Sequence, residues 1–292
     1  MPRCLTFATA LRRLCPLLAL FAILLCQRSL PGAEPVITIP SYNQFTEQDE
    51  AKIGAALTSE FESKYPVLDN ALLNSYLAGV VKRLADRSRR PELAYSCKML
   101  NIASVNALSL PGGHIYVTRG LLEFTGNESE LAAVIAHEIG HIAARHALNR
   151  FSLELRSKDM WASAKGAMPN LAGAGLEKAF QTMGLPLVDM LALRYDRANE
   201  READLLGFYN LIRSGWNPAG EVSYLGRIPA AGGDADIFAD WRQAHPDGGE
   251  RSRVVAAELK EAALSPSLDD NSMAFRTMKL GLDLLPKPSG AK

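Results

Sequence analysis

Cysteine and histidine are scarce in this chain of 292 residues, and its basic residues form no long tract. There are four cysteines and five histidines, and 32 lysines and arginines balance 32 acidic residues, so that the net charge is zero. Nucleic-acid binding needs a concentrated basic surface, and this balance therefore argues against nucleic acid as a partner. The chain is 48% hydrophobic and 22% charged, which is the composition of a folded globular protein.

Apolar runs long enough to cross a membrane are missing as well. The leucine-rich run from Leu14 to Cys26 has 13 residues, well short of the roughly 20 that a membrane-spanning helix needs. Three arginines precede this run, and the small residues Gly32 and Ala33 follow it. This order is typical of a secretory signal peptide, so we predict that residues 1–33 are removed near Ala33 and that the protein is exported to the periplasm.

Cys26 leaves a second interpretation open, in which the chain is a lipoprotein acylated at this cysteine. Leu25 argues against it, because such signals carry a small residue at this place. Loss of residues 1–33 removes three cysteines, four arginines and no acidic residue, which leaves 28 basic against 32 acidic residues. Cys97 is then the one remaining cysteine, so we expect no internal disulfide and a buried structural thiol.

The length allows one substantial core, and we predict one main domain at residues 34–265 followed by a C-terminal tail at 266–292. Hydrophobic spacing and capping residues predict both helices and short strands in the first half of this domain. The predicted elements are a helix at 46–64 with a capping box of Thr46 and Asp49, a helix with an apolar face at 72–84, a strand within 93–102, and a strand pair within 106–120 folded about Pro111, Gly112 and Gly113.

The second half of the domain is dominated by two predicted helices. One begins after the cap Asn127 and runs through the sequence HEIGH, and the other covers about 195–213 and ends at Gly215. Between them, residues 160–193 are rich in alanine and glycine and carry only scattered charges. This segment fits buried helices, a mobile lid, or a loop in peripheral contact with a membrane, and its composition does not choose among them.

Three of the five histidines lie within "LAAVIAHEIGHIAARHALNR". Positions four apart project from one face of a helix, so His137 and His141 can share one metal ion, and their spacing suits zinc. Glu138 lies about 100° around the helix from His137, beside the metal, where a general base for a water molecule should stand. The expected number of chance H-E-x-x-H matches in such a chain is on the order of 0.01, so the motif strongly favours a site.

A catalytic zinc needs a third protein ligand. His146 is five positions after His141 and too far around a continuous helix, which makes it a helix-surface residue or a neighbour of a ligand. The downstream sequence "RYDRANEREADLLG" places Glu200 and Asp204 four apart on one helical face. Glu200 can complete the ligand set, and Asp204 can accept the N–H of a ligating histidine. We therefore expect about one zinc ion per chain.

These two segments, together with "NALSLPGGHIYVTRGLL" and "HPDGGER", resemble the gluzincin-type zinc endopeptidases that include HtpX, the CAAX prenyl proteases and BepA. The resemblance covers roughly residues 45–255. It implies a mostly helical α+β fold, with an active-site helix, a small edge-strand sheet and a second ligand-bearing helix. It also assigns zinc ligation to His137, His141 and Glu200 and the role of catalytic base to Glu138. We expect a single-domain, periplasmic form of this family.

The resemblance also gives a role to the first of the paired strands. In the family, the corresponding edge strand is thought to bind the substrate backbone, and main-chain pairing of this kind tolerates many substrate sequences. It implies substrate binding by Asn106, Ala107, Leu108 and Ser109. His114, just after the glycine turn, is more simply a strand residue that faces solvent.

His245 lies in a sequence, His-Pro followed five residues later by Arg251, that also resembles the family. The resemblance places it near the metal, where two catalytic roles are open. It can stabilise the oxyanion on the scissile carbonyl as a hydrogen-bond donor, or it can occupy the open metal position and hold the enzyme off. The other interpretation is an ordinary loop histidine.

Two functions follow from these observations. The first is a zinc endopeptidase that hydrolyses peptide bonds of unfolded or misassembled envelope proteins. The second is a periplasmic chaperone or assembly factor for outer-membrane proteins, in which proteolysis is secondary or restrained. The intact H-E-x-x-H motif favours the enzyme, because a binding module has no need of Glu138. The sequence does not give the oligomeric state.

Overall fold

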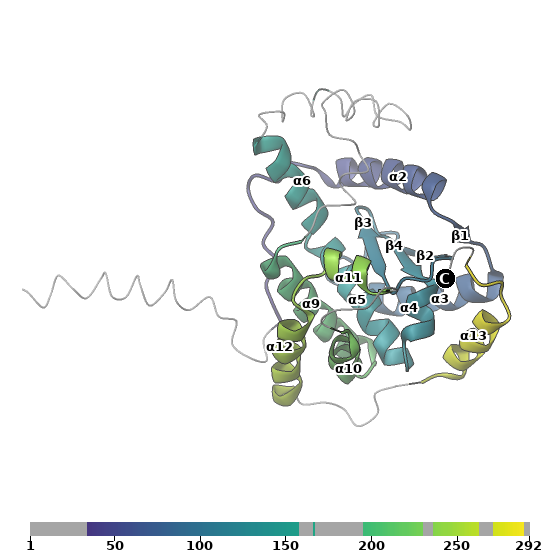
Figure 1. Cartoon of the computed structure of the whole chain (residues 1–292). Coiled ribbons are helices and arrows are strands. Elements are labelled where there is room, and N and C mark those ends of the chain that lie inside the picture. Colours follow the sequence, from purple (N-terminus) through teal and green to yellow (C-terminus); the bar gives the residue numbers. More distant parts are fainter. Residues whose placement is uncertain (1–33, 158–165, 167–194, 230–235, 263–270, 289–292) are drawn as a thin grey trace, which may run out of the picture.

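The computed structural model describes most of the chain outside the N-terminal segment (Figure 1). The predicted signal peptide at 1–33 and nearly all of the segment 160–193 lie outside the described residues, so the predictions for them are not tested. The described residues are 34–157, 166, 195–229, 236–262 and 271–288.

The described residues form a mostly helical α+β fold, as the resemblance implies. The helices are α2 (Glu47–Lys64), α3 (Ala71–Ala85), α4 (Arg119–Phe124), α5 (Glu128–Ala143), α6 (His146–Ser157), α9 (Arg197–Ser214), α10 (Ala219–Arg227), α11 (Ala239–Ala244), α12 (Gly248–Glu261) and α13 (Met273–Asp283). The strands are β1 (Val67–Leu68), β2 (Ser96–Leu100), β3 (Ala107–Leu110) and β4 (His114–Thr118). Among the described helices, none combines the length and the hydrophobicity that crossing a bilayer requires.

The four strands form one small mixed sheet in the order β1-β2-β4-β3. The predicted strand pair is the antiparallel hairpin β3–β4, and β2 runs parallel to β4 on its other side. Gly112 and Gly113 form the hairpin turn with φ angles of 84° and 103°, which glycine adopts without strain. The hairpin leaves β3 at the edge of the sheet, with one side free of strand partners within the described chain.

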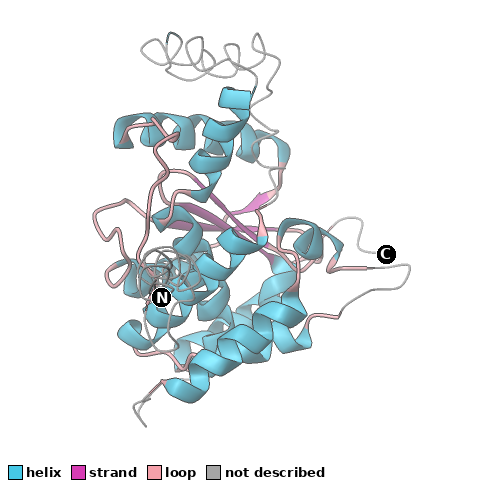
Figure 2. Cartoon of the chain, turned by 90° about the vertical axis from the view of Figure 1, so that its left-hand side faces the viewer, coloured by secondary structure: helices cyan, strands magenta, loops and turns pink. Residues whose placement is uncertain are grey.

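The sheet separates two hydrophobic clusters because successive side chains of a strand point to opposite faces. On β4, Ile115 and Val117 join the larger cluster with α3 and α5, whereas Tyr116 joins a smaller cluster with α2 and α6. Cys97 on β2 belongs to the larger cluster and is a buried free thiol, as predicted. In Figures 1 and 2 the sheet accordingly lies between helical layers, with α2 above it in the first view.

Helix ends in this fold follow the predicted capping residues. Thr46 and Asp49 form the expected capping box at α2, and the Asn127 side chain accepts a hydrogen bond from the Glu130 amide at the start of α5. Gly215 ends α9 in the left-handed conformation with a φ of 78°. These three caps satisfy backbone groups that helix ends leave without partners, and they fix where α5 and α9 begin or end.

Small residues let α5 and α9 approach closely. A Cβ atom added to Gly140 would lie 2.8 Å from the carbonyl oxygen of Ala203, and one added to Gly207 would lie 3.0 Å from the backbone nitrogen of His137. Any larger side chain at these places would push the helices apart. The glycine of HEIGH therefore serves the packing of the two helices that carry the predicted metal ligands.

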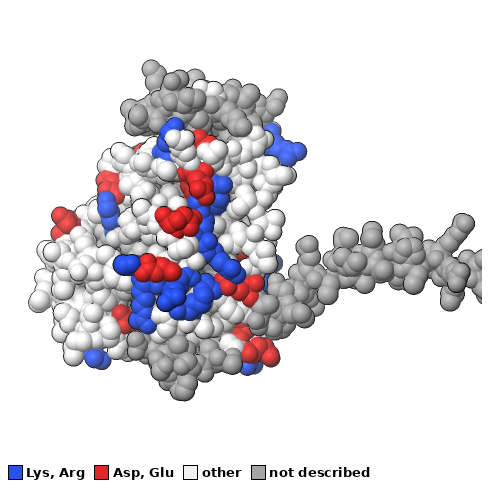
Figure 3. Space-filling model, turned by 180° about the vertical axis from the view of Figure 1, so that it is seen from behind, with Lys and Arg blue, Asp and Glu red and all other residues white. Residues whose placement is uncertain are grey.

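Helix α13 lies inside the range predicted as a C-terminal tail, 266–292. Its residues Phe275, Met278 and Leu282 are buried in the larger cluster. The boundary at 265 stays a prediction, but this helix is packed on the core. On the face seen in Figure 3, basic side chains lie among acidic ones.

Candidate metal centre and active site

Four buried side chains from three segments converge at one point. His137 and His141 come from α5, Glu200 from α9, and His245 from the residue that follows α11. One ligand atom of each lies within 4.8 Å of all the others. The sequence prediction named the first three as ligands and placed His245 near them, and the structure brings all four together.

The distances among these atoms fit a single zinc ion. The Nε2 atoms of His137 and His141 are 2.9 Å apart, and the Glu200 carboxylate lies 3.3 Å from the His141 Nε2 and 3.6 Å from the His137 Nε2. Ligands about 2.0–2.1 Å from a tetrahedral zinc are about 3.3–3.4 Å from one another. Two imidazoles and one carboxylate are also a donor set of catalytic zinc sites. The residues present therefore suit this metal.

Asp204 lies where the sequence analysis placed it, behind the first histidine. Its Oδ1 is 2.9 Å from the Nδ1 of His137, so the carboxylate can accept the N–H of that ring. This contact leaves Nε2 deprotonated and aimed at the metal position, because only one ring nitrogen of a neutral imidazole carries a proton. The role of Asp204 as the partner of a ligating histidine remains a prediction with this geometry in its support.

His146 is not on the HEIGH helix. Helix α5 ends at Ala143, Arg145 has a φ of 55°, and a new helix begins at His146. This break turns the His146 side chain inward, to 1% exposure, with its Nδ1 2.8 Å from the Nδ1 of His141. The helix-surface interpretation is therefore wrong, and the ring lies against His141, as the alternative of a neighbour of a predicted ligand requires. On the far side, the His146 Nε2 lies 3.1 Å from Glu202.

Arg251 joins the two acidic residues of α9. Its Nε and Nη2 form a fork with both oxygens of Asp204, at 2.8 and 2.6 Å, and its Nη1 lies 2.6 Å from Glu200. The guanidinium is buried and also lies over the Trp241 ring. It thus compensates two carboxylates that burial would otherwise strongly disfavour as charged groups.

The local electrostatics favour the protonation states that bind a metal. Burial and the neighbouring His137 hold the pKa of His141 well below its usual range, so its ring is neutral. Burial by itself would raise the pKa of Glu200, but His245, His141 and Arg251 outweigh burial and hold this pKa below its usual range. Burial would likewise raise the pKa of Asp204, but the opposing charge of Arg251 outweighs burial and lowers this pKa to about 2.

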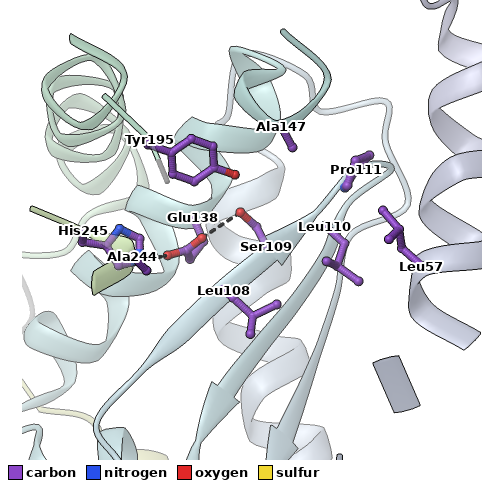
Figure 4. A pocket seen from close by; sticks show the side chains of 10 residues that line it. All are labelled: Leu57, Leu108, Ser109, Leu110, Pro111, Glu138, Ala147, Tyr195, Ala244 and His245. Atoms are coloured by element: carbon purple, nitrogen blue, oxygen red, sulfur yellow. Dashed lines mark hydrogen bonds and ion pairs between the residues drawn. The ribbon is translucent and has the colours of Figure 1, made fainter. Parts of the chain in front are cut away.

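Glu138 is buried beside the ligand cluster and is held by the edge strand. Its Oε2 accepts a hydrogen bond of 2.7 Å from the Ser109 hydroxyl, and its Oε1 lies 3.6 Å from the His245 Nε2. Figure 4 shows both contacts at the wall of a cleft. The cleft has a volume of about 50 Å³ and is lined by Leu57, Leu108, Ser109, Leu110, Pro111, Glu138, Ala147, Tyr195, Ala244 and His245.

The predicted substrate-binding residues divide into two groups. Leu108 and Ser109 on β3 line this cleft, whereas Asn106 and Ala107 lie at the start of the strand and are not among its lining residues. His114 opens β4, is half-buried and lies 3.1 Å from the Ser96 hydroxyl, away from the ligand cluster. Substrate binding by β3 stays a prediction that the position of this edge strand supports.

Sequence reasoning did not single out Tyr195 and gave Arg251 no role of its own. Tyr195 lines the cleft together with Glu138, and its ring stacks on His141 with centroids 4.0 Å apart. Its one signal in the sequence was its place just before the helix that carries Glu200. Arg251 was visible only as part of the His-Pro pattern, and nothing in the sequence connected it to Asp204.

Comparisons with known proteins agree with this geometry. The family model described as peptidase family M48 matches residues 71–259. The chain is 26% identical over 181 residues to the beta-barrel assembly-enhancing protease of Escherichia coli. This alignment covers 61% of this chain and 37% of that protein. It is 31% identical over 205 residues to the mitochondrial metalloendopeptidase OMA1 of Arabidopsis thaliana. This alignment covers 68% of this chain and 39% of the relative.

A third relative is closer in length. The chain is 26% identical over 180 residues to the metalloprotease YcaL of Escherichia coli, covering 61% of this chain and 67% of that protein. By contrast, the aligned region spans about two fifths of the two relatives above. The family match covers more than half of the chain and includes His245 and both helices that carry the predicted ligands. The chain therefore belongs to peptidase family M48, a family of zinc metalloproteases.

Proposed function

We propose that this protein is a zinc endopeptidase that hydrolyses peptide bonds of unfolded or misassembled exported proteins. One observation carries the proposal: the buried His137–His141–Glu200 cluster also includes His245, which lies beside Glu138 at the wall of a cleft bordered by an edge strand. The metal ligands are His137, His141 and Glu200, and Glu138 is the general base. Asp204 orients His137, and Arg251 compensates the negative charges of Asp204 and Glu200.

When bound, zinc supplies Lewis acidity that polarises the scissile carbonyl and makes water more acidic. Glu138 takes a proton from the attacking water as the new C–O bond forms, and it returns this proton to the amine nitrogen as the C–N bond breaks. Ser109 donates to one oxygen of Glu138 and so fixes the direction of the carboxylate. The other oxygen, Oε1, faces the ligand cluster, as the 3.6 Å distance to His245 shows.

The edge strand supports extended, unfolded polypeptides as substrates. Strand β3 pairs with β4 on one side, and Leu108 and Ser109 line the cleft. A substrate strand that adds to this edge binds through main-chain hydrogen bonds, which do not depend on its side chains. Only an unfolded segment can supply a free strand. The predicted signal peptide at 1–33 makes exported proteins the pool from which substrates are drawn, and one relative is named for enhancing beta-barrel assembly.

The direct test uses protein lacking residues 1–33 with unfolded casein as substrate. We expect cleavage, its loss after removal of metal with a chelator, and its return when one equivalent of zinc is added. The metal content before and after treatment checks that about one zinc is bound per chain. A related measurement tests the alternative function: suppression of the aggregation of an unfolded outer-membrane protein by the metal-free protein.

The two functions give different results in this pair of assays. Zinc-dependent cleavage of casein supports the endopeptidase. If zinc is bound but no polypeptide is cut, while aggregation is still suppressed without metal, the endopeptidase proposal is wrong and the chaperone or assembly factor is the function.

His245 has the geometry of a restraint on this activity. Its Nδ1 lies 3.2 Å from Glu200, and the residue belongs to the same group of four converging side chains. A catalytic zinc needs an open position beside three protein ligands, and the imidazole of His245, as the fourth member of the group, would fill that position. Of the two catalytic roles open for His245, this arrangement favours the plug over the oxyanion donor.

Replacing His245 with alanine is therefore expected to raise kcat/KM for a short peptide by several-fold, because the fourth position is freed while three ligands remain. The measurement is initial rates at saturating zinc, with the thermal midpoint followed in parallel. Gln243, which is exposed two residues earlier, gives the matched control Gln243→Ala, for which no change is expected. A slower His245→Ala variant with unaltered stability would identify an oxyanion donor, and an unaltered rate would exclude both roles.

A further inference from the structure

We propose that the Tyr195 hydroxyl is the hydrogen-bond donor to the oxyanion that develops on the scissile carbonyl. This inference rests on the proposed function. The residue lines the cleft together with Glu138 and Ser109, and its hydroxyl points into the cleft on the side of these two groups (Figure 4). A phenol keeps its proton at neutral pH and can therefore donate to a developing negative charge.

The Tyr195 ring is held in place by neighbours of the metal centre. It stacks on His141 with an interplanar angle of 19° and centroids 4.0 Å apart, and it lies against His146 with centroids 5.9 Å apart. On the chain it directly precedes Asp196, whose side chain caps the first turn of α9. A donor that is fixed before the reaction costs little reorganisation when charge develops, which is the condition for effective oxyanion stabilisation.

The other polar side chains of the cleft are already engaged. The Ser109 hydroxyl donates to Glu138, and the two nitrogens of His245 face Glu200 and Glu138. Among the residues that the structure describes, the Tyr195 hydroxyl has no hydrogen-bond partner, although it lines the cleft. It is thus the lining side chain whose donor is free to meet a substrate oxygen.

The proposed contact fits a balanced step. Water attacks the carbonyl carbon, its proton passes to Glu138, and the carbonyl electron pair moves onto oxygen, where the Tyr195 hydroxyl donates a hydrogen bond. When the C–N bond breaks, the electron pair returns to form the new carboxyl group and Glu138 protonates the leaving amine. Tyr195 itself stays protonated throughout, so no further reactant is needed.

The test is Tyr195→Phe, which removes the hydroxyl and keeps the ring that stacks on His141. Removal of one oxyanion donor typically lowers kcat by about 10²–10³, and a decrease of this kind is expected here with KM changed less than about twofold and zinc content unaltered. Tyr209→Phe is the matched control, because it removes a hydroxyl on α9 that donates to Glu258 outside the cleft. Its kcat should stay within about twofold of that of the unmodified protein.

A binding measurement separates a catalytic role from a structural one. A phosphinic peptide carries the tetrahedral, anionic geometry of the reacting carbonyl, and Tyr195→Phe should weaken its binding by a factor similar to the loss in kcat. The intact substrate peptide should bind equally well with Tyr195 or phenylalanine when both are compared in the uncleaving Glu138→Gln background. Equal loss of affinity for both peptides, or loss of zinc, would overturn the inference in favour of a packing role.

Failure of this inference differs from failure of the proposed function. If the unmodified protein cleaves casein and Tyr195→Phe cleaves it as fast, only the role of Tyr195 is wrong. If the unmodified, zinc-loaded protein cleaves nothing, the endopeptidase proposal fails and the inference fails with it.

Discussion

Changing Glu138 to glutamine is expected to lower kcat for peptide hydrolysis by about 10²–10⁴ while one zinc stays bound per chain. Glutamine has nearly the size of glutamate and can still accept from Ser109 through its amide oxygen. It cannot take a proton from water at neutral pH, so the attacking water is no longer activated. The side chain is beside the ligand cluster and is not one of its members, which is the reason for expecting metal content to be unaffected.

The measurements are steady-state cleavage of a fluorogenic peptide and the zinc content of the purified variant. Glu47→Gln is a suitable control, since Glu47 is exposed at the start of α2, and it should leave both quantities unchanged. A Glu138→Gln variant with near-normal proteolysis would remove the assignment of the base. Loss of zinc from this variant would instead mean that the carboxylate contributes to metal binding.

Local sequence patterns predicted the parts of the site that lie on single helices. His137 and His141, and likewise Glu200 and Asp204, are four residues apart, so helical geometry alone places each pair on one face. That the two pairs meet required the resemblance, because no pattern within either helix says which helix it packs against. The small residues Gly140 and Gly207, which let the helices meet, were not recognised as packing positions.

The sequence analysis misplaced His146 and gave no role to Tyr195 or Arg251. The position of His146 depends on a break in the backbone, and the other two residues come from distant segments. His146 was placed on a continuous helix, but the chain breaks after Ala143 and turns this ring towards His141. Residues 142–150, IAARHALNR, contain no proline or glycine that would mark the break. Tyr195 and Arg251 reach the centre from segments whose own periodicity carries no information about a metal.

The fold was predictable to the same extent as the site. Capping residues and hydrophobic spacing gave the helices at α2, α3, α5 and α9, and the glycine turn gave the hairpin. The parallel pairing of β2 with β4 was not foreseen, because it joins strands that a whole hairpin strand separates along the chain. Burial of α13 against α3 likewise depends on contacts between segments far apart in the chain, which local patterns do not report.

The second large effect is expected for Arg251→Met, which should lower the free energy of unfolding by about 3–5 kcal/mol. Arg251 is 6% exposed and is paired with both Asp204 and Glu200. Methionine fills much of the same space but leaves the buried Asp204 carboxylate without its counter-charge. Because that carboxylate also orients His137, zinc affinity should fall by about 10–100-fold.

Urea unfolding of the zinc-loaded proteins measures the free energy of unfolding, and competition with a chelator measures the zinc affinity. Arg253→Met is the matched control, because Arg253 is exposed on the same helix, and the stability of this variant should change by less than about 0.5 kcal/mol.

Adding Asp204→Asn to Arg251→Met should restore part of the stability, since it removes the uncompensated charge. It should not restore zinc affinity, because an amide accepts more weakly from His137 than a carboxylate does. Equal stabilities of the Arg251 and Arg253 variants would show that the charge of Asp204 is compensated by other groups, and that the arginine is dispensable to the centre.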